Sequence, residues 1–109
     1  MQIKYQIEIQ NEAIIQNLKK LTNQIYKLLP NREEGIDWKK PLTTILEEFA
    51  GMNRLFLNSH SLLFTLLCKL EGLFTLDDDK DGENKNFLIF RKTIFECLSL
   101  VNDLVKICF

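Results

Sequence analysis

Large apolar residues recur at seven-residue intervals along most of this 109-residue chain. A second set of apolar residues lies three or four positions from the first. Together the two sets form one apolar face of an α-helix, which has about 3.6 residues per turn. Helices with one apolar face are stable when they pack around a shared core. The pattern therefore predicts an all-α fold, an antiparallel up-down helical bundle. The residues that carry it are Ile7, Ile14, Leu18, Leu21, Ile25, Leu28, Leu42, Ile45, Phe49, Met52, Phe56, Leu63, Leu66, Leu70, Leu73, Phe87, Phe90, Ile94, Cys97, Val101, Leu104 and Cys108.

Breaks in the pattern place the helix ends. Proline disfavours helical backbone in the residue before it, so the first helix should end at Leu29-Pro30. Gly35 should turn the chain and Asp37 should cap the second helix. The weak helix formers of NSHS, residues 58–61, predict a break or a kink. We expect one domain over residues 1–109 with four helices, or three long ones if the chain is only kinked; the ranges are about 3–29, 38–57, 60–74 and 86–108, with loops at 30–37 and 75–85.

The N-terminal stretch QIKYQIEIQ is ambiguous, because Ile3, Tyr5, Ile7 and Ile9 alternate with polar residues as in a β-strand. A single strand in a helical chain has nothing to pair with unless another molecule supplies a strand. We therefore predict that residues 2–10 are helical.

Charge limits the classes of function. The chain has 14 basic and 15 acidic side chains, a net charge of −1, and so does not require the basic face of a free-standing nucleic-acid binder. A helical accessory subunit of a nucleic-acid-associated complex stays open as an alternative. Its possible phosphate contacts are Lys19, Lys20, Lys27, Lys39 and Lys40.

Three cysteines, Cys68, Cys97 and Cys108, are odd in number and lie in apolar segments, which predicts reduced core thiols and a cytoplasmic protein.

Lys69 and Glu71 interrupt the longest apolar run, which argues against a membrane span. No metal-binding cysteine or histidine spacing and no glycine-rich phosphate loop is present. We therefore expect no cofactor and no small-molecule substrate. The abundance of Lys, Asn, Ile, Leu and Phe is compatible with an AT-rich microbial or phage genome.

The acidic stretch DDDKDG, residues 77–82, is similar to the first half of an EF-hand calcium loop. Asp77, Asp79, Asp81 and Gly82 occupy the first, third, fifth and sixth positions of that loop. The twelfth position, which needs a bidentate carboxylate, is Leu88. We favour a solvated turn between helices, with a weak cation site at the three aspartates as the alternative.

Arg54 and His60 form the pattern R-x5-H, which resembles the loose arginine–histidine motif of HEPN-type ribonucleases. Those enzymes are helical bundles that often work as dimers. The resemblance implies that His60 would act as acid or base and that Arg54 would hold negative charge at a scissile phosphate. The alternative, which we favour, is a histidine in a helix kink that bonds to backbone.

The C-terminal segment has more apolar residues than one helix face can bury, because a further stripe of Leu88, Phe95, Leu98 and Val105 lies beside the seam. Large exposed apolar patches on monomers usually mark interaction sites. We therefore predict a non-catalytic protein–protein interaction module: a subunit, adaptor or inhibitor whose partner is another protein or a second copy. The residues expected to carry the interaction are Trp38, Phe95, Leu98 and Val105.

Overall fold

Four α-helices and one short 3-10 helix make up the computed structural model, which describes residues 2–52, 60–77 and 85–107, and the side chains of 12–52, 61–77 and 85–106. They are α1 Gln2–Glu33, α2 Lys39–Gly51, α3 His60–Gly72, the 3-10 helix η2 Leu73–Thr75, and α4 Lys85–Ile107. The prediction that residues 2–10 are helical is confirmed, since α1 includes them.

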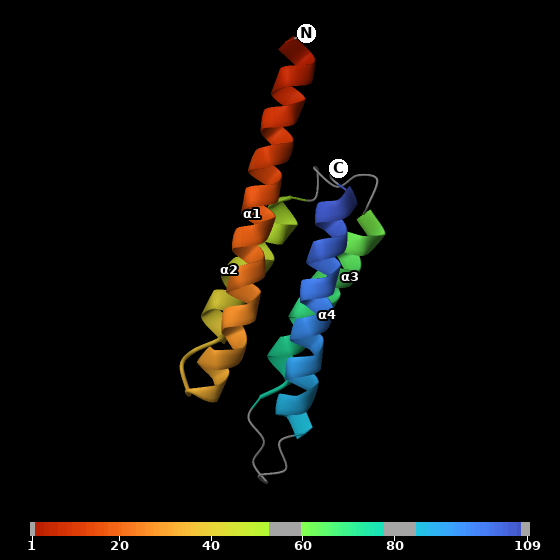
Figure 1. Ribbon diagram of the computed structural model, residues 1–109. Coiled ribbons are helices and arrows are strands. Elements are labelled where there is room, and N and C mark those ends of the chain that lie inside the picture. The colour runs from red at the N-terminus through yellow and green to blue at the C-terminus, as the bar shows by residue number, and fades with distance from the viewer. Residues whose placement is uncertain (1, 53–59, 78–84, 108–109) are drawn as a thin grey trace.

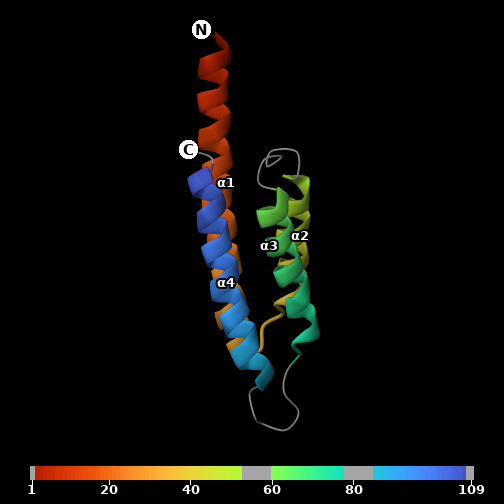
Figure 2. The ribbon, with the colours of Figure 1, turned by 90° about the vertical axis from the view of Figure 1, so that its right-hand side faces the viewer.

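The helices alternate in direction and form a closed ring of four (Figure 1). Each packs on its neighbours, α1 on α2, α2 on α3, α3 on α4, and α4 back on α1. Seen from the side, α1 and α4 form one layer and α2 and α3 the other (Figure 2). The predicted all-α antiparallel bundle is confirmed in its four-helix form. Because α2 and α3 run in opposite directions, the chain reverses between them and is not merely kinked.

The core is built from the seven-residue pattern. Its members are spaced so that they share one face of each helix, and the four faces meet on the bundle axis. Many residues of the pattern are fully enclosed, with at most 1% of their surface exposed. They are Leu18, Leu21, Ile25, Leu28, Leu42, Ile45, Phe49, Leu63, Leu66, Leu70, Leu73, Phe90, Ile94, Cys97, Val101 and Leu104.

The end of α1 differs from the prediction, because the helix continues through Pro30 to Glu33. Pro30 has no amide hydrogen to donate to the carbonyl one turn earlier, yet the helix continues past it, and the chain closes instead at Gly35, whose φ is 74°. The amide of Ile36 donates to the carbonyl of Asn31 at 2.8 Å and that of Gly35 to Arg32 at 3.2 Å, which is a Schellman motif with glycine at its left-handed position. The glycine, not the proline, ends the helix.

The bounds of α2 and α3 follow from local hydrogen bonds. As predicted, Asp37 caps α2: its Oδ1 accepts from the amides of Lys39 at 3.0 Å and Lys40 at 3.4 Å. The helix ends at Gly51, earlier than the expected residue 57, and the amide of Met52 bonds to the carbonyl of Phe49 at 3.1 Å. At the end of α3 the chain tightens into η2, which keeps Leu73 in the core.

The first three turns of α1 extend beyond the other helices (Figures 1 and 2). Residues 2–13 form this extension, an arm of about 18 Å at the usual rise per residue. The arm accounts for much of the 62 Å length of the molecule, whose other extents are 24 and 19 Å. We call residues 2–13 the α1 arm.

Within the described helices, no segment is long and apolar enough to cross a membrane.

Candidate functional site

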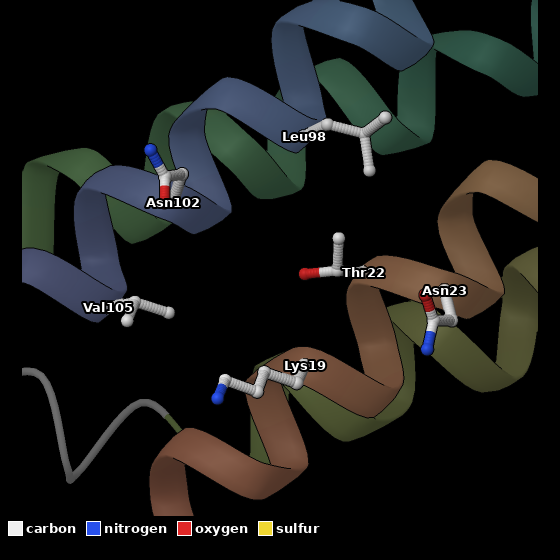
Figure 3. A pocket seen from close by; sticks show the side chains of 6 residues that line it. All are labelled: Lys19, Thr22, Asn23, Leu98, Asn102 and Val105. Atoms are coloured by element: carbon white, nitrogen blue, oxygen red, sulfur yellow. The ribbon is translucent and has the colours of Figure 1, made fainter.

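An open groove runs between α1 and α4 on the outside of the bundle. Its volume is about 360 Å3, and six residues line it: Lys19, Thr22, Asn23, Leu98, Asn102 and Val105. We call it the α1–α4 groove. Leu98 and Val105 point from α4 toward Thr22 and Lys19 on α1 (Figure 3).

The groove has an apolar floor and a polar rim. Leu98 and Val105 pack against the core on one side and remain partly accessible on the other. Lys19, Asn23 and Asn102 are exposed at the rim. The hydroxyl of Thr22 donates to the carbonyl of Leu18 at 2.8 Å, so Thr22 presents mainly its methyl group. No acidic side chain lines the groove among the described residues. Such a surface suits a partner helix with apolar residues along one stripe.

Two exposed aromatic rings lie at one end of the groove. Tyr26 is one turn beyond Thr22 on α1, and Phe95 is one turn before Leu98 on α4. Since the two helices are antiparallel, both steps lead in the same direction. Tyr26 is 54% exposed and Phe95 is 47% exposed, with the guanidinium of Arg91 at 5.8 Å from the Phe95 ring. Both rings are thus exposed one turn from residues that line the groove.

Two of the four residues predicted to carry an interaction line this groove, Leu98 and Val105, and a third, Phe95, is exposed one turn before Leu98. Trp38 is not part of this surface. It is only 7% exposed, and its ring packs edge-on against Phe90 at 4.9 Å between centroids. As an exposed anchor Trp38 is wrong, because its indole is buried among the core residues.

The five lysines proposed as phosphate contacts are all exposed but do not form one patch. Lys19 belongs to the α1–α4 groove, and Lys39 is engaged in an ion pair with Asp77, with 2.5 Å between Nζ and Oδ1. Lys20, Lys27 and Lys40 extend from other parts of α1 and α2. Contact with nucleic acid stays a prediction.

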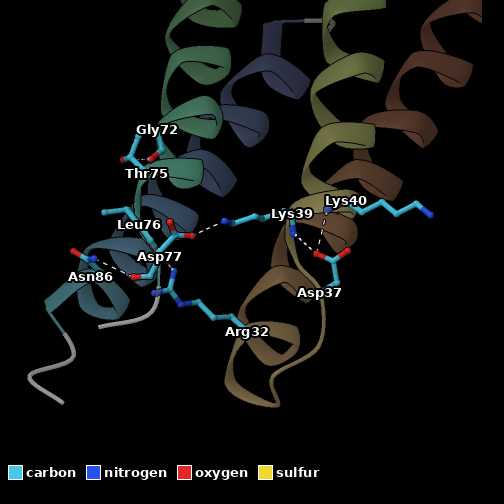
Figure 4. Close-up of polar contacts among 9 residues, drawn as sticks. All are labelled: Arg32, Asp37, Lys39, Lys40, Gly72, Thr75, Leu76, Asp77 and Asn86. Atoms are coloured by element: carbon cyan, nitrogen blue, oxygen red, sulfur yellow. Dashed lines mark hydrogen bonds and ion pairs between the residues drawn. The ribbon is translucent and has the colours of Figure 1, made fainter. Parts of the chain in front are cut away.

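The acidic stretch is described only at its first residue, and Asp79 and Asp81 lie outside the described part of the chain. Lys39 holds the pKa of the Asp77 carboxyl below its usual range by donating to it. The side-chain amide of Asn86 donates to the Asp77 carbonyl at 3.0 Å (Figure 4). No group of three or more potential ligands gathers within the ranges that the structure covers. Asp77 thus takes part in a polar contact between α2 and the segment after η2.

Arg32 is the residue of greatest consequence that sequence reasoning missed. It is 7% exposed, and its guanidinium lies 4.6 Å from the Phe90 ring centre, 5.4 Å from Trp38 and 6.0 Å from Phe87. One of its nitrogens donates to the carbonyl of Leu76 (Figure 4). A signal for its burial is present, because Arg32 continues the seven-residue spacing of Leu18 and Ile25.

The structure does not describe the side chains of the two residues in the ribonuclease-like pattern. Arg54 lies outside the described residues, and of His60 only the backbone is described, at the first position of α3. The ribonuclease hypothesis stays a prediction.

An ion pair joins α3 to α4 near the middle of the bundle. Nζ of Lys69 donates to Oε2 of Glu96 at 2.6 Å. This hydrogen bond lowers the pKa of the Glu96 carboxyl and raises that of the Lys69 ammonium. Both side chains are more than a third exposed, so the pair fixes position more than it stabilises.

The described cysteines are free thiols in two different environments. Cys97 is buried as predicted, whereas Cys68 is exposed because it lies on the outer face of α3. Cys108 lies outside the described residues. Burial raises the pKa of the Cys97 thiol to about 12.

Cys97 should therefore resist alkylation while the protein is folded. An ordinary free thiol has a pKa of about 8.5, so near pH 8 the thiolate of Cys97 is depleted roughly a thousandfold. With iodoacetamide at that pH, mass-spectrometric peptide mapping should find Cys68 modified early and Cys97 unmodified. In urea, where burial is lost, both should react at similar rates. Equal rates in the folded protein would show that Cys97 is not enclosed.

No family model, curated protein or solved structure matches the chain. What the protein does must therefore be inferred from its own surface.

Proposed function

We propose that the protein is a non-catalytic protein–protein interaction module, a subunit, adaptor or inhibitor, that receives a partner's amphipathic helix in the α1–α4 groove. The observation that carries the proposal is the apolar floor of Leu98 and Val105, with the exposed Tyr26 and Phe95 one turn from residues that line the groove. An antiparallel helix pair with such a groove can take a third helix by the same ridge-and-groove packing that holds the bundle together.

The charges around the groove support a partner with acidic flanks. Lys19 is at the rim on the α1 side. On α4, Lys106 is one turn beyond Asn102, and Arg91 is one turn before Phe95. Complementary charges at a rim favour association and orient the partner more than they add affinity. We place the module in the cytoplasm on the basis of its free thiols.

The proposal is tested by placing a charge on the groove floor. Leu98→Asp should weaken association at least about a hundredfold, because docking would bury an unpaired carboxylate. Ser99→Asp is the matched control: it makes the same charge change on the next residue, which is exposed and is not part of the groove lining. Association is measured by native mass spectrometry of complexes isolated with the full chain, and helicity by circular dichroism.

The expected result is loss of the complex in Leu98→Asp, retention in Ser99→Asp, and helical signal in both. If the two variants associated equally well, the α1–α4 groove would not be the interface. Because Leu98 also packs on the core, Phe95→Asp serves as a second variant at an exposed ring. It should weaken association at a cost in folding free energy of no more than about 1 kcal/mol.

A further inference from the structure

We propose that the occupant of the α1–α4 groove is the α1 arm of a second copy of this chain, so that two chains exchange arms about a two-fold axis. This inference rests on the proposed function, because it names the partner of the same groove. Four observations carry it: the arm's position, the pattern of its residues, its length and its charge.

The arm is a helical segment that lies beyond the other helices of its own bundle, so it has no neighbouring helix there to pack on. Residues 2–13 extend past the ends of α2, α3 and α4 in both views (Figures 1 and 2). Isolated helices shorter than about 12–15 residues are marginal in water. The arm is not isolated, since it continues a packed helix, but most helical stability in proteins comes from packing of an amphipathic face, which the arm's own bundle does not supply.

The residue pattern gives the arm two apolar faces. At about 100° per residue, Ile3 and Ile7 continue the face of α1 that carries Leu21. Tyr5 and Ile9 are four apart and lie on the opposite face of the helix. A helix that served only its own bundle would need one apolar face. The second face accounts for the strand-like alternation of QIKYQIEIQ and suits a helix enclosed on two sides.

The arm also matches the length of the surface it would cover. If two α1 helices pair antiparallel with residue 8 of one opposite residue 19 of the other, then residues 2–13 of each lie beside residues 25–14 of its partner. The arm ends just before Ile14, which packs on the core. This register puts Tyr5 at the level of Thr22, and Thr22 lines the groove together with Leu98. Each chain would contribute 12 arm residues and the 12 residues it covers, within the range of about 20–30 per side of a stable interface.

Charge favours this register. Glu8 of the arm is opposite Lys19 of the partner chain, which is the basic residue of the groove rim. The two-fold axis makes this contact twice. No acidic residue among the described lining of the groove opposes it.

The test is a charge exchange in the full chain. The wild type should have twice the mass of the 12.8 kDa chain by native mass spectrometry and light scattering. Glu8→Lys and Lys19→Glu each place like charges together at both symmetric contacts, and each should weaken the dimer on the order of tenfold. The double variant restores opposite charges and should recover wild-type affinity. The matched control is Lys20→Glu, which makes the same charge change on an exposed residue a helical step away from the groove and should have no effect.

The outcomes separate this inference from the proposed function. If Leu98→Asp abolished the dimer while Glu8→Lys and Lys19→Glu left its affinity unchanged, the groove would still be an interface. The arm would then not be its occupant. A monomer that binds a different protein through the groove would lead to the same conclusion. A dimer unaffected by Leu98→Asp would overturn both. Rescue in the double variant, with no change in Lys20→Glu, establishes the arm exchange.

Discussion

Phe90→Ala is expected to lower the free energy of unfolding by about 4 kcal/mol, the usual cost of removing a buried phenyl ring. The ring is fully enclosed, meets Trp38 edge-on at 4.9 Å and has the Arg32 guanidinium 4.6 Å from its centre. Alanine would leave a cavity that these large, fixed neighbours cannot fill. Urea denaturation followed by circular dichroism measures the change.

The control for this variant is Phe95→Ala, on the same helix. Phe95 is 47% exposed, so its loss should cost no more than about 1 kcal/mol. Similar costs for the two variants would mean that Phe90 does not stand in the core. The pair separates burial from the chemistry of the side chain, which is the same at both positions.

Arg32→Ala should destabilise the protein by about 3 kcal/mol, from lost cation–π contacts and an unsatisfied carbonyl. The guanidinium faces three aromatic rings and donates to the carbonyl of Leu76. Arg32→Lys keeps the charge but not the flat, many-donor group, and should recover only part of the loss. The same urea measurement applies.

Arg91→Ala is the matched control, because Arg91 is exposed and has a single ring, Phe95, at 5.8 Å. Its cost should stay within about 1 kcal/mol. Equal costs at the two arginines would contradict the structural role given to Arg32. Since Arg32 and Phe90 are in contact, the double variant Arg32→Ala/Phe90→Ala should cost less than the sum of the two single changes.

Much of the fold could be predicted because residues with a seven-residue apolar pattern form helices that bury one face in a shared core. Where their side chains are described, the residues of that pattern became the core or, as Ile14 and Phe87 do, pack against it. The helix ends were less predictable. Pro30 is compatible with the last turn of a helix, and only the hydrogen bonds around Gly35 show which of the two residues ends α1.

The candidate site could be predicted on one of its two sides. Leu98, Val105 and Phe95 stand out because α4 has more apolar residues than its core face needs. Their counterparts Thr22 and Asn23 carry no such signal, since a groove depends on which helices become neighbours and in what register. Trp38 was misjudged and Arg32 was overlooked for a related reason. An indole and a guanidinium are suited to either surface or interior, and only the packing of α2 and α4 around them decides.

The contacts of Arg32 with Leu76 and of Lys39 with Asp77 have a mechanical consequence. They connect the hairpin of α1 and α2 to the hairpin of α3 and α4 at the end of the bundle where α1 terminates (Figure 4). Lys19 and Val105 lie toward the opposite end, together with the α1 arm. The two hairpins are thus held together at this end by polar contacts as well as by the core that they share. Fraying of the bundle from this end must therefore break both contacts, whereas fraying from the end toward Lys19 and Val105 meets neither of them.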